Sequence, residues 1–143
     1  MVPPLFLTLE QALALHADQV SRHGGDASLR DRGLLESALA MPMAQFGGAF
    51  LHHDLFEMAA AYMFHLVMNH AFVDGNKRTG AVASLVFLDM NGVSITATNR
   101  ALAEFVLRIA KGDVEKPEIA AWLRAHADKP RSSTSRRPKR PRR

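Results

Sequence analysis

Cysteine is absent from this sequence of 143 residues, and tryptophan and tyrosine occur once each. Without cysteine the chain cannot form a disulfide framework, a zinc–thiolate site or a thiol nucleophile. Long apolar runs are also lacking, so no segment could cross a bilayer, and the first residues lack the basic start of a secretory leader. These absences favour a cytoplasmic protein without a membrane partner, and we expect that localisation.

Acidic residues are missing from the C-terminal segment. Residues 129–143 contain eight of the 18 basic residues and no acid, whereas residues 1–128 carry ten basic and all 14 acidic residues. The segment consists of Lys, Arg, Pro, Ser and Thr and has nothing apolar to bury, so we expect it to be disordered. The sequence thus predicts one domain, residues 1–128, followed by a disordered basic tail, residues 129–143. The pI of about 10.0 reflects that tail and is no argument for nucleic-acid binding by the domain.

Apolar residues recur at helical spacing along most of the domain. The predicted helices cover residues 8–22, 31–41, 54–70 and 76–91, with two more beginning near residues 99 and 117. The apolar face at residues 54–70 is the widest, which predicts a central position for that helix. We therefore expect an all-α fold, a compact bundle of about six helices.

The helix ends carry recognisable capping residues. Thr8 is followed three positions later by Gln11, the spacing of a capping box. The other residues expected to begin helices are Asp31, Asp54, Asn99 and Pro117. Between two of these helices, residues 42–53 contain Pro and two Gly and have no helical period. That segment fits either a flap or hairpin, or an ordinary surface loop.

The densest group of reactive side chains lies at residues 70–78, which read HAFVDGNKR. The segment joins two predicted helices, so the start of the second one offers free N–H groups and a positive dipole end to phosphate oxygens. Gly75 would let a ligand approach the backbone closely, and Lys77 and Arg78 add positive charge. Asp74 would repel a phosphate unless Mg²⁺ lay between them, and carboxylate oxygen suits that ion.

A histidine at the start of this segment supplies the remaining group for transfer to a hydroxyl. Neutral His70 could take the hydroxyl proton during phosphoryl or nucleotidyl transfer. Taken singly, His70 is more often a structural or surface histidine, and Asp74 more often a helix cap. Each of these ordinary interpretations explains one residue. None explains why His70 and Asp74 occur together with Lys77 and Arg78 at the start of a helix. Phe72 is expected to point into the core and anchor the loop.

The same residues resemble the core motif of the Fic/Doc family. Lysine at position 77 is similar to the Doc (death-on-curing) branch, whereas most AMP-transferring Fic proteins have glycine there. Further segments resemble the family: Gly24-Gly25, Leu29-Arg30-Asp31, residues 34–39 with Pro42, residues 59–62, and residues 87–88 with Asn91-Gly92. The resemblance spans about residues 5–125 and excludes the basic tail.

The resemblance implies the toxin of a type II toxin–antitoxin system. Doc-like proteins are protein kinases that transfer phosphate from ATP to a threonine of elongation factor Tu and so halt translation. It implies ATP as co-substrate, Mg²⁺ at Asp74, and His70 as the base. Gly75, Asn76, Lys77 and Arg78 would bind the nucleotide phosphates. Residues 42–53 fall where the family has a flap that docks the target as an added strand.

Three departures refine that expectation. Ala81 stands where AMP-transferring members usually have a second arginine, which together with Lys77 disfavours AMPylation. The family's inhibitory run, a Ser or Thr followed four residues later by Glu, is not found. We therefore expect a Phd-like antitoxin to supply the inhibitory helix in trans. Ala27 and Ser28 replace an expected glycine, which changes a turn and not the chemistry.

Other functions remain alternatives. A Fic-type adenylyltransferase would use the same residues on the α-phosphate. An HD-type metal phosphohydrolase could use His52-His53-Asp54 with His65 and His70. A nucleic-acid-binding module could act through residues 129–143, although a solvated, poorly ordered terminus is the favoured explanation of that composition. An inactive relative is a further option, but no residue of the motif at 70–78 is missing.

Overall fold

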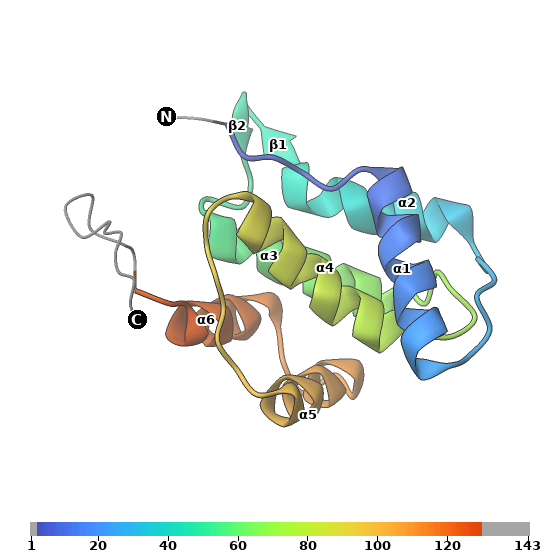
Figure 1. The fold of residues 1–143 in the computed structure, drawn as a ribbon. Coiled ribbons are helices and arrows are strands. Elements are labelled where there is room, and N and C mark those ends of the chain that lie inside the picture. The colour runs from blue at the N-terminus through green and yellow to red at the C-terminus, as the bar shows by residue number, and fades with distance from the viewer. Residues whose placement is uncertain (1–2, 130–143) are drawn as a thin grey trace, which may run out of the picture.

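The computed structural model describes residues 3–129, which form a bundle of helices (Figure 1). This part of the chain contains α1 (Leu9–His23), α2 (Arg32–Ala40), α3 (Leu55–Met68), α4 (Asn76–Met90), α5 (Asn99–Ala110) and α6 (Lys116–His126). A 3₁₀ turn (Met41–Met43) and two short strands, β1 (Gln45–Phe46) and β2 (Ala49–Phe50), separate α2 from α3. The predicted all-α fold of about six helices is confirmed.

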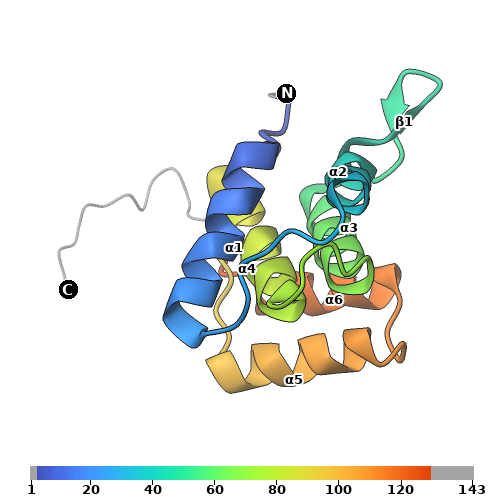
Figure 2. The ribbon, with the colours of Figure 1, turned by 90° about the vertical axis from the view of Figure 1, so that its right-hand side faces the viewer.

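Helix α3 is the central element, as its wide apolar face predicted. It contacts α2, α4, α5 and α6, and α1 packs on the bundle through α4. Figure 2 shows α1 beside α4, α2 above α3, and α5 and α6 below this pair. Eight of the 14 residues of α3 are buried. Because α3 and α4 form the core pair, the loop that joins them is fixed at both ends.

Three predicted N-caps are confirmed. Thr8 and Gln11 form a reciprocal capping box at the start of α1. The carboxylates of Asp31 and Asp54 accept hydrogen bonds from backbone N–H groups three residues later, at 3.0 Å and 2.8 Å. Each cap satisfies a donor that the first helical turn leaves without a partner.

The start of α5 differs from the prediction. Thr98, not Asn99, is the N-cap, because Thr98 has extended backbone and its hydroxyl accepts from Ala101 N–H at 3.0 Å. Asn99 is already helical. At the last helix, Lys116 precedes Pro117 in the first turn and Glu115 provides the cap. Both shifts are of one or two residues and leave the helices where the periodicity placed them.

Residues 42–53 contain a hairpin, which confirms the flap reading over an ordinary loop. Strands β1 and β2 are antiparallel, with Gln45 opposite Phe50. Gly47 and Gly48 both have positive φ, 62° and 82°, as tight hairpin turns require. Phe46 is 81% exposed, whereas Phe50 packs against the N-terminal segment. The hairpin therefore projects one large apolar side chain into solvent.

The predicted disordered tail, residues 129–143, lies outside the described residues except for Lys129. None of the helices between residues 3 and 129 combines the length and apolar character needed to cross a membrane.

Candidate active site

The residues predicted to carry chemistry lie in the loop between α3 and α4. Helix α3 ends at Met68 and α4 begins at Asn76, which confirms the helix–loop–helix junction. The loop runs against the segment before α2, where Leu29 and Phe72 form an isolated antiparallel bridge. Val73 N–H also donates to Ser28 at 3.1 Å. The junction is thus supported by a segment about forty positions earlier in the chain.

His70 is exposed at the start of the loop. Its backbone has φ 51°, the only positive φ of a non-glycine residue in the described range. The carbonyl of His70 accepts from Arg30 Nε at 2.7 Å, but the imidazole makes no hydrogen bond to any residue between 3 and 129. A substrate hydroxyl could therefore reach the ring without displacing a protein partner.

Asp74 lies near the other end of the loop and is also exposed. One carboxylate oxygen accepts from Asp26 N–H at 2.9 Å, and the other has no protein donor in the described part of the chain. Hydrogen bonds from Ser28 lower the pKa of Asp26 itself. Gly25 lies close to this carboxylate, because a Cβ there would be 3.2 Å from that of Asp74.

The surroundings of Asp74 offer Mg²⁺ a single carboxylate. No group of three or more His, Asp or Glu side chains that could enclose a metal occurs within residues 3–129. Mg²⁺ usually binds one or two carboxylates and takes its remaining ligands from phosphates and water. A single exposed carboxylate beside a helix N-terminus fits such an ion when it arrives with a phosphate ligand.

His16 of α1 was not predicted as a site residue, yet it fixes the end of the loop. Its Nε2–H donates to the carbonyl of Asp74 at 2.7 Å, and its ring stacks on Phe72 at 3.6 Å and 7°. Only 2% of His16 is exposed. A Cβ at Gly75, which has φ 83°, would meet the His16 ring at 3.4 Å. The sequence did contain one indication of this role. His16 follows Ala12 by four positions, which places the histidine on the apolar face of α1.

Asn76 has a different role from the one predicted for its side chain. Its Oδ1 accepts from Phe72 N–H at 3.0 Å and its Nδ2 donates to the Phe72 carbonyl at 2.9 Å. The side chain is almost fully buried, with 8% exposed. The amide therefore closes the loop on itself and does not face a ligand. Only the backbone N–H of Asn76 is left for phosphate.

The first turn of α4 has free donors and positive charge. The backbone N–H groups of Asn76, Lys77 and Arg78 have no acceptor among residues 3–129, and Thr79 is the first to bond, to Gly75 at 2.9 Å. Lys77 and Arg78 are exposed and form no ion pair with a described residue. Free N–H groups, the helix dipole and two cations together favour an anion at this end.

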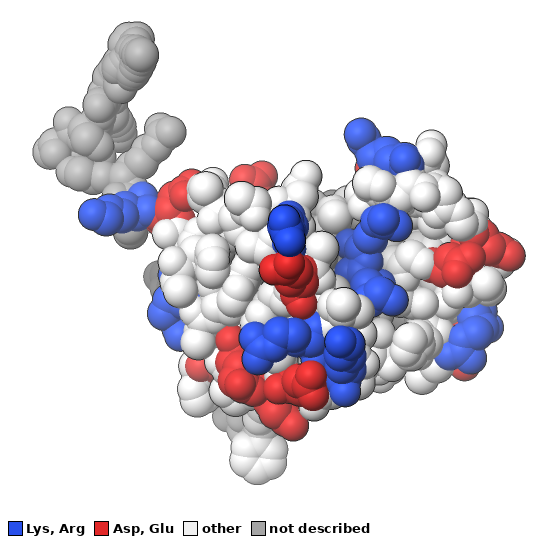
Figure 3. Space-filling view, turned by 90° about the horizontal axis from the view of Figure 1, so that it is seen from below, with Lys and Arg blue, Asp and Glu red and all other residues white. Residues whose placement is uncertain are grey.

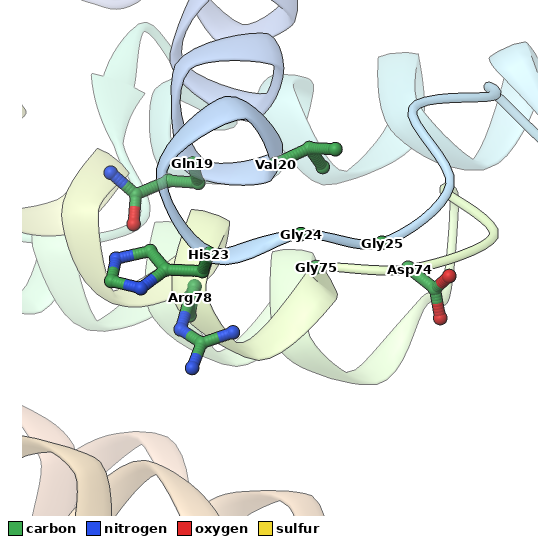
Figure 4. A pocket seen from close by; sticks show the side chains of 8 residues that line it. All are labelled: Gln19, Val20, His23, Gly24, Gly25, Asp74, Gly75 and Arg78. Atoms are coloured by element: carbon green, nitrogen blue, oxygen red, sulfur yellow. The ribbon is translucent and has the colours of Figure 1, made fainter.

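A pocket of about 330 Å³ opens beside this helix end (Figure 4). Helix α1 and the glycines after it form one wall, and the junction forms the other. The lining residues are Gln19, Val20, His23, Gly24, Gly25, Asp74, Gly75 and Arg78. Figure 4 shows the Arg78 side chain beside His23, with Asp74 further along the junction. The pocket thus includes three of the predicted site residues, but not His70, Asn76 or Lys77.

Two of the five residues named for the HD-type alternative make structural contacts. Asp54 caps α3 and pairs with Arg124 at 3.0 Å. His65 contacts Lys116, with 3.2 Å between Nε2 and Nζ. Since no metal-binding cluster occurs in the described residues, the structure does not support a metal phosphohydrolase.

The nucleic-acid alternative concerns residues 129–143, which lie outside the described residues apart from Lys129, so the structure shows only the charge pattern of the domain itself. On the face seen in Figure 3, Lys and Arg side chains are interleaved with Asp and Glu. A uniform basic surface, the usual footprint of a nucleic-acid-binding domain, is not seen on that face.

Comparison with known proteins gives an independent result. A family model described as the Fic/DOC family matches residues 6–88. Toxin Doc of Mycolicibacterium smegmatis is 40% identical over 107 residues, which are 73% of this chain and 82% of that protein. Protein kinase doc of Escherichia phage P1 is 33% identical over 115 residues, or 80% of this chain and 90% of that protein. The family match covers more than half of the chain and includes the whole α3–α4 junction, so this protein belongs to the Fic/DOC family.

Proposed function

We propose that this protein is a Doc-type toxin that transfers the γ-phosphate of ATP to a serine or threonine hydroxyl of a translation factor. Two relatives with these names, a Toxin Doc and a Protein kinase doc, support the proposal. Lys77, the residue by which the motif resembles the Doc branch, supports it as well.

The observation that carries the proposal is the arrangement of one loop. An exposed imidazole, His70, stands at its start, and the unpaired N–H groups of α4 stand at its end. The first group can accept a proton, and the second can bind phosphate oxygens. Phosphoryl transfer to an alcohol requires both functions within reach of one another.

The reaction then assigns a task to each residue. His70 takes the proton of the acceptor hydroxyl as its oxygen bonds to the γ-phosphorus, and the bond from that phosphorus to the β–γ bridging oxygen breaks to release ADP. The N–H groups at Gly75–Arg78 and the cations of Lys77 and Arg78 stabilise the charge on the phosphates. Asp74 would hold Mg²⁺, which when bound neutralises negative charge on the phosphate chain.

Position 81 favours a kinase over an adenylyltransferase. The resemblance would require a second arginine there for AMP transfer, and Ala81 is instead a small side chain with 6% exposed. The start of α4 therefore presents its two cations at the adjacent positions 77 and 78, whereas the AMP-transferring pattern has glycine at 77 and a second arginine at 81. AMP transfer remains an outcome of the experiment below.

The proposed partners follow from the hairpin and from the missing inhibitory run. The acceptor is elongation factor Tu, bound through the β1–β2 hairpin, whose exposed Phe46 and open strand edges suit an added strand. A Phd-like antitoxin supplies the inhibitory helix in trans. Both partners would meet the toxin in the cytoplasm.

The test compares two radioactive labels. The purified protein is incubated with Mg²⁺, elongation factor Tu and ATP labelled at either the γ- or the α-phosphate. We expect γ-label in the factor, and His70→Ala should slow the transfer by about 10²- to 10⁴-fold because the general base is lost. Asp74→Asn should also reduce the rate, and extra Mg²⁺ should recover part of it.

Arg100→Ala is the control, because Arg100 is exposed on α5, pairs only with Glu104 among the described residues, and belongs neither to the junction nor to the hairpin segment. It should transfer label like the unmodified protein. Transfer of α-label alone would replace the kinase assignment by AMPylation. Equal rates for His70→Ala and the unmodified protein would remove His70 as the base. In growing bacteria, the unmodified protein should arrest growth and His70→Ala should not at equal protein levels.

A further inference from the structure

We propose that Arg30 is the positioning residue for His70. Its guanidinium holds the backbone at the end of α3 in the left-handed conformation from which the imidazole stands free in solvent. The inference rests on the proposed function, since it concerns the base of that reaction.

The conformation of His70 needs an external restraint. A side chain with Cβ rarely adopts φ 51°, and such a residue persists where its surroundings determine it. The helix geometry of α3 ends just before it, at Met68. A left-handed residue is common directly after a helix C-cap, but the N–H of His70 bonds to no carbonyl of α3 in the described residues, so α3 itself supplies no hydrogen bond that fixes this backbone.

Arg30 supplies that restraint through hydrogen bonds to successive carbonyls. Its Nε–H donates to His70 at 2.7 Å, and its terminal Nη2 donates to Asn69 at 3.4 Å. The backbone N–H groups of Arg30 and Asp31 donate to the next carbonyl, that of Ala71, at 2.7 Å and 2.9 Å. Two residues thus satisfy the three consecutive carbonyls that directly follow α3.

The charge of Arg30 is available for this contact. Arg30 forms no ion pair with any residue between 3 and 129, so no carboxylate competes with the two carbonyls. The guanidinium donates in a fixed plane from several N–H groups, which suits two neighbouring carbonyls. A lysine has one compact ammonium and could not fix both in the same geometry.

The hydrogen bonds of the Arg30 side chain are distinct from the backbone hydrogen bonds that hold the loop against residues 28–31. The backbone bonds of Arg30 and Asp31 to Ala71, and of Val73 to Ser28, do not involve the Arg30 side chain. Replacement of Arg30 by Gln keeps these bonds and removes only the bonds from the guanidinium. The loop should therefore stay in place while His70 loses its restraint.

The experiment compares full-length Arg30→Gln with Arg32→Gln. Arg32 is a matched control, because it lies two positions away, is exposed and pairs only with Glu36 on α2 among the described residues. For Arg30→Gln we expect kcat to fall by about ten- to a hundred-fold, the effect of a misplaced catalytic group, with KM for ATP changed by less than about two-fold. The NMR backbone shifts of His70 should leave the left-handed range. Arg32→Gln should match the unmodified protein in all three measurements.

Two results would overturn the inference. One is unchanged His70 backbone shifts in Arg30→Gln, whatever the activity. The other is a higher KM for ATP with normal kcat, which would make Arg30 a nucleotide-binding residue. If the unmodified protein transfers no label, the proposed function fails, and the NMR comparison still decides whether Arg30 holds His70.

Discussion

At the junction, polar side chains divide into buried ones that hold the backbone and exposed ones that face solvent. His16 and Asn76 are buried and bond to loop backbone, whereas His70 and Asp74 are exposed. Buried polar groups need partners, and the loop backbone provides them. The exposed groups keep atoms without a partner among the described residues, as the chemistry proposed for them requires.

His16→Phe tests the positioning role at this scale. Phenylalanine can keep the stack on Phe72 but cannot donate to the Asp74 carbonyl. We expect the free energy of unfolding to fall by about 1 kcal/mol, the usual worth of one hydrogen bond, and KM for ATP to rise as Asp74 and Gly75 shift. Urea unfolding and steady-state kinetics measure both effects. An unchanged KM would show that the bond from His16 does not position the phosphate site.

Among the elements, the contact between α3 and α4 determines where the site forms. Gly80 of α4 lies against α3 so closely that a Cβ there would be 2.7 Å from Val67 Cγ2 and 3.2 Å from the carbonyl of Met63. A small residue is therefore required if the two helices are to pack at this distance. The loop at 70–75 takes its shape from this spacing, because both helix ends are fixed.

Gly80→Ala should destabilise the protein despite the higher helix propensity of alanine. Overpacking costs about 2 kcal/mol and the propensity gain recovers about 1 kcal/mol, so we expect a net loss of about 1 kcal/mol. Gly33→Ala in α2 is the comparison, since its Cβ would meet only Asp31 Oδ1 at 3.4 Å. That variant should be as stable as the unmodified protein or more so. Urea unfolding of the three proteins tests the difference, and equal midpoints would contradict the close contact.

For the whole molecule, the packing of α6 on α3 encloses a small cluster of basic groups. His65 Nε2 accepts from Lys116 Nζ at 3.2 Å, and His52 Nε2 is buried without a partner among residues 3–129. Burial, then Lys116 and His52, lowers the pKa of His65 to about 4. Burial and Lys116 lower the pKa of His52 as well, against the opposing effect of Glu57. A proton on either ring would place like charges together at the interface.

This cluster predicts that acid weakens the fold. Between pH about 6.5 and about 4, the unfolded chain binds a proton at His65 that the folded protein excludes. The free energy of unfolding should therefore be greatest above pH 6.5 and fall as the pH is lowered through this range. Urea unfolding at pH 7.5 and pH 5.0 measures the loss. His65→Gln should show a smaller loss, and an equal loss in both proteins would assign the effect to other groups.

Local patterns in the sequence predicted much of this protein. The helix positions, three N-caps and the junction at 70–75 depend on residues within a few positions of one another, so periodicity and capping rules located them. Two glycines in a segment without helical period allowed a hairpin at residues 42–53 but did not distinguish it from an ordinary surface loop. The one cap placed wrongly, Asn99 for Thr98, depended on a single residue's backbone conformation, which no periodic pattern specifies.

Tertiary structure alone decided how the junction is held. His16 and Asp74 are 58 positions apart, and Arg30 and His70 are 40 positions apart. No spacing rule joins such residues, because their contact exists only after α1, α2 and the α3–α4 pair have packed. The sequence by itself thus determined which groups could bind phosphate and accept a proton. Packing decided that the Asn76 amide serves the loop, that His16 and Arg30 support its two ends, and that the His70 imidazole remains free.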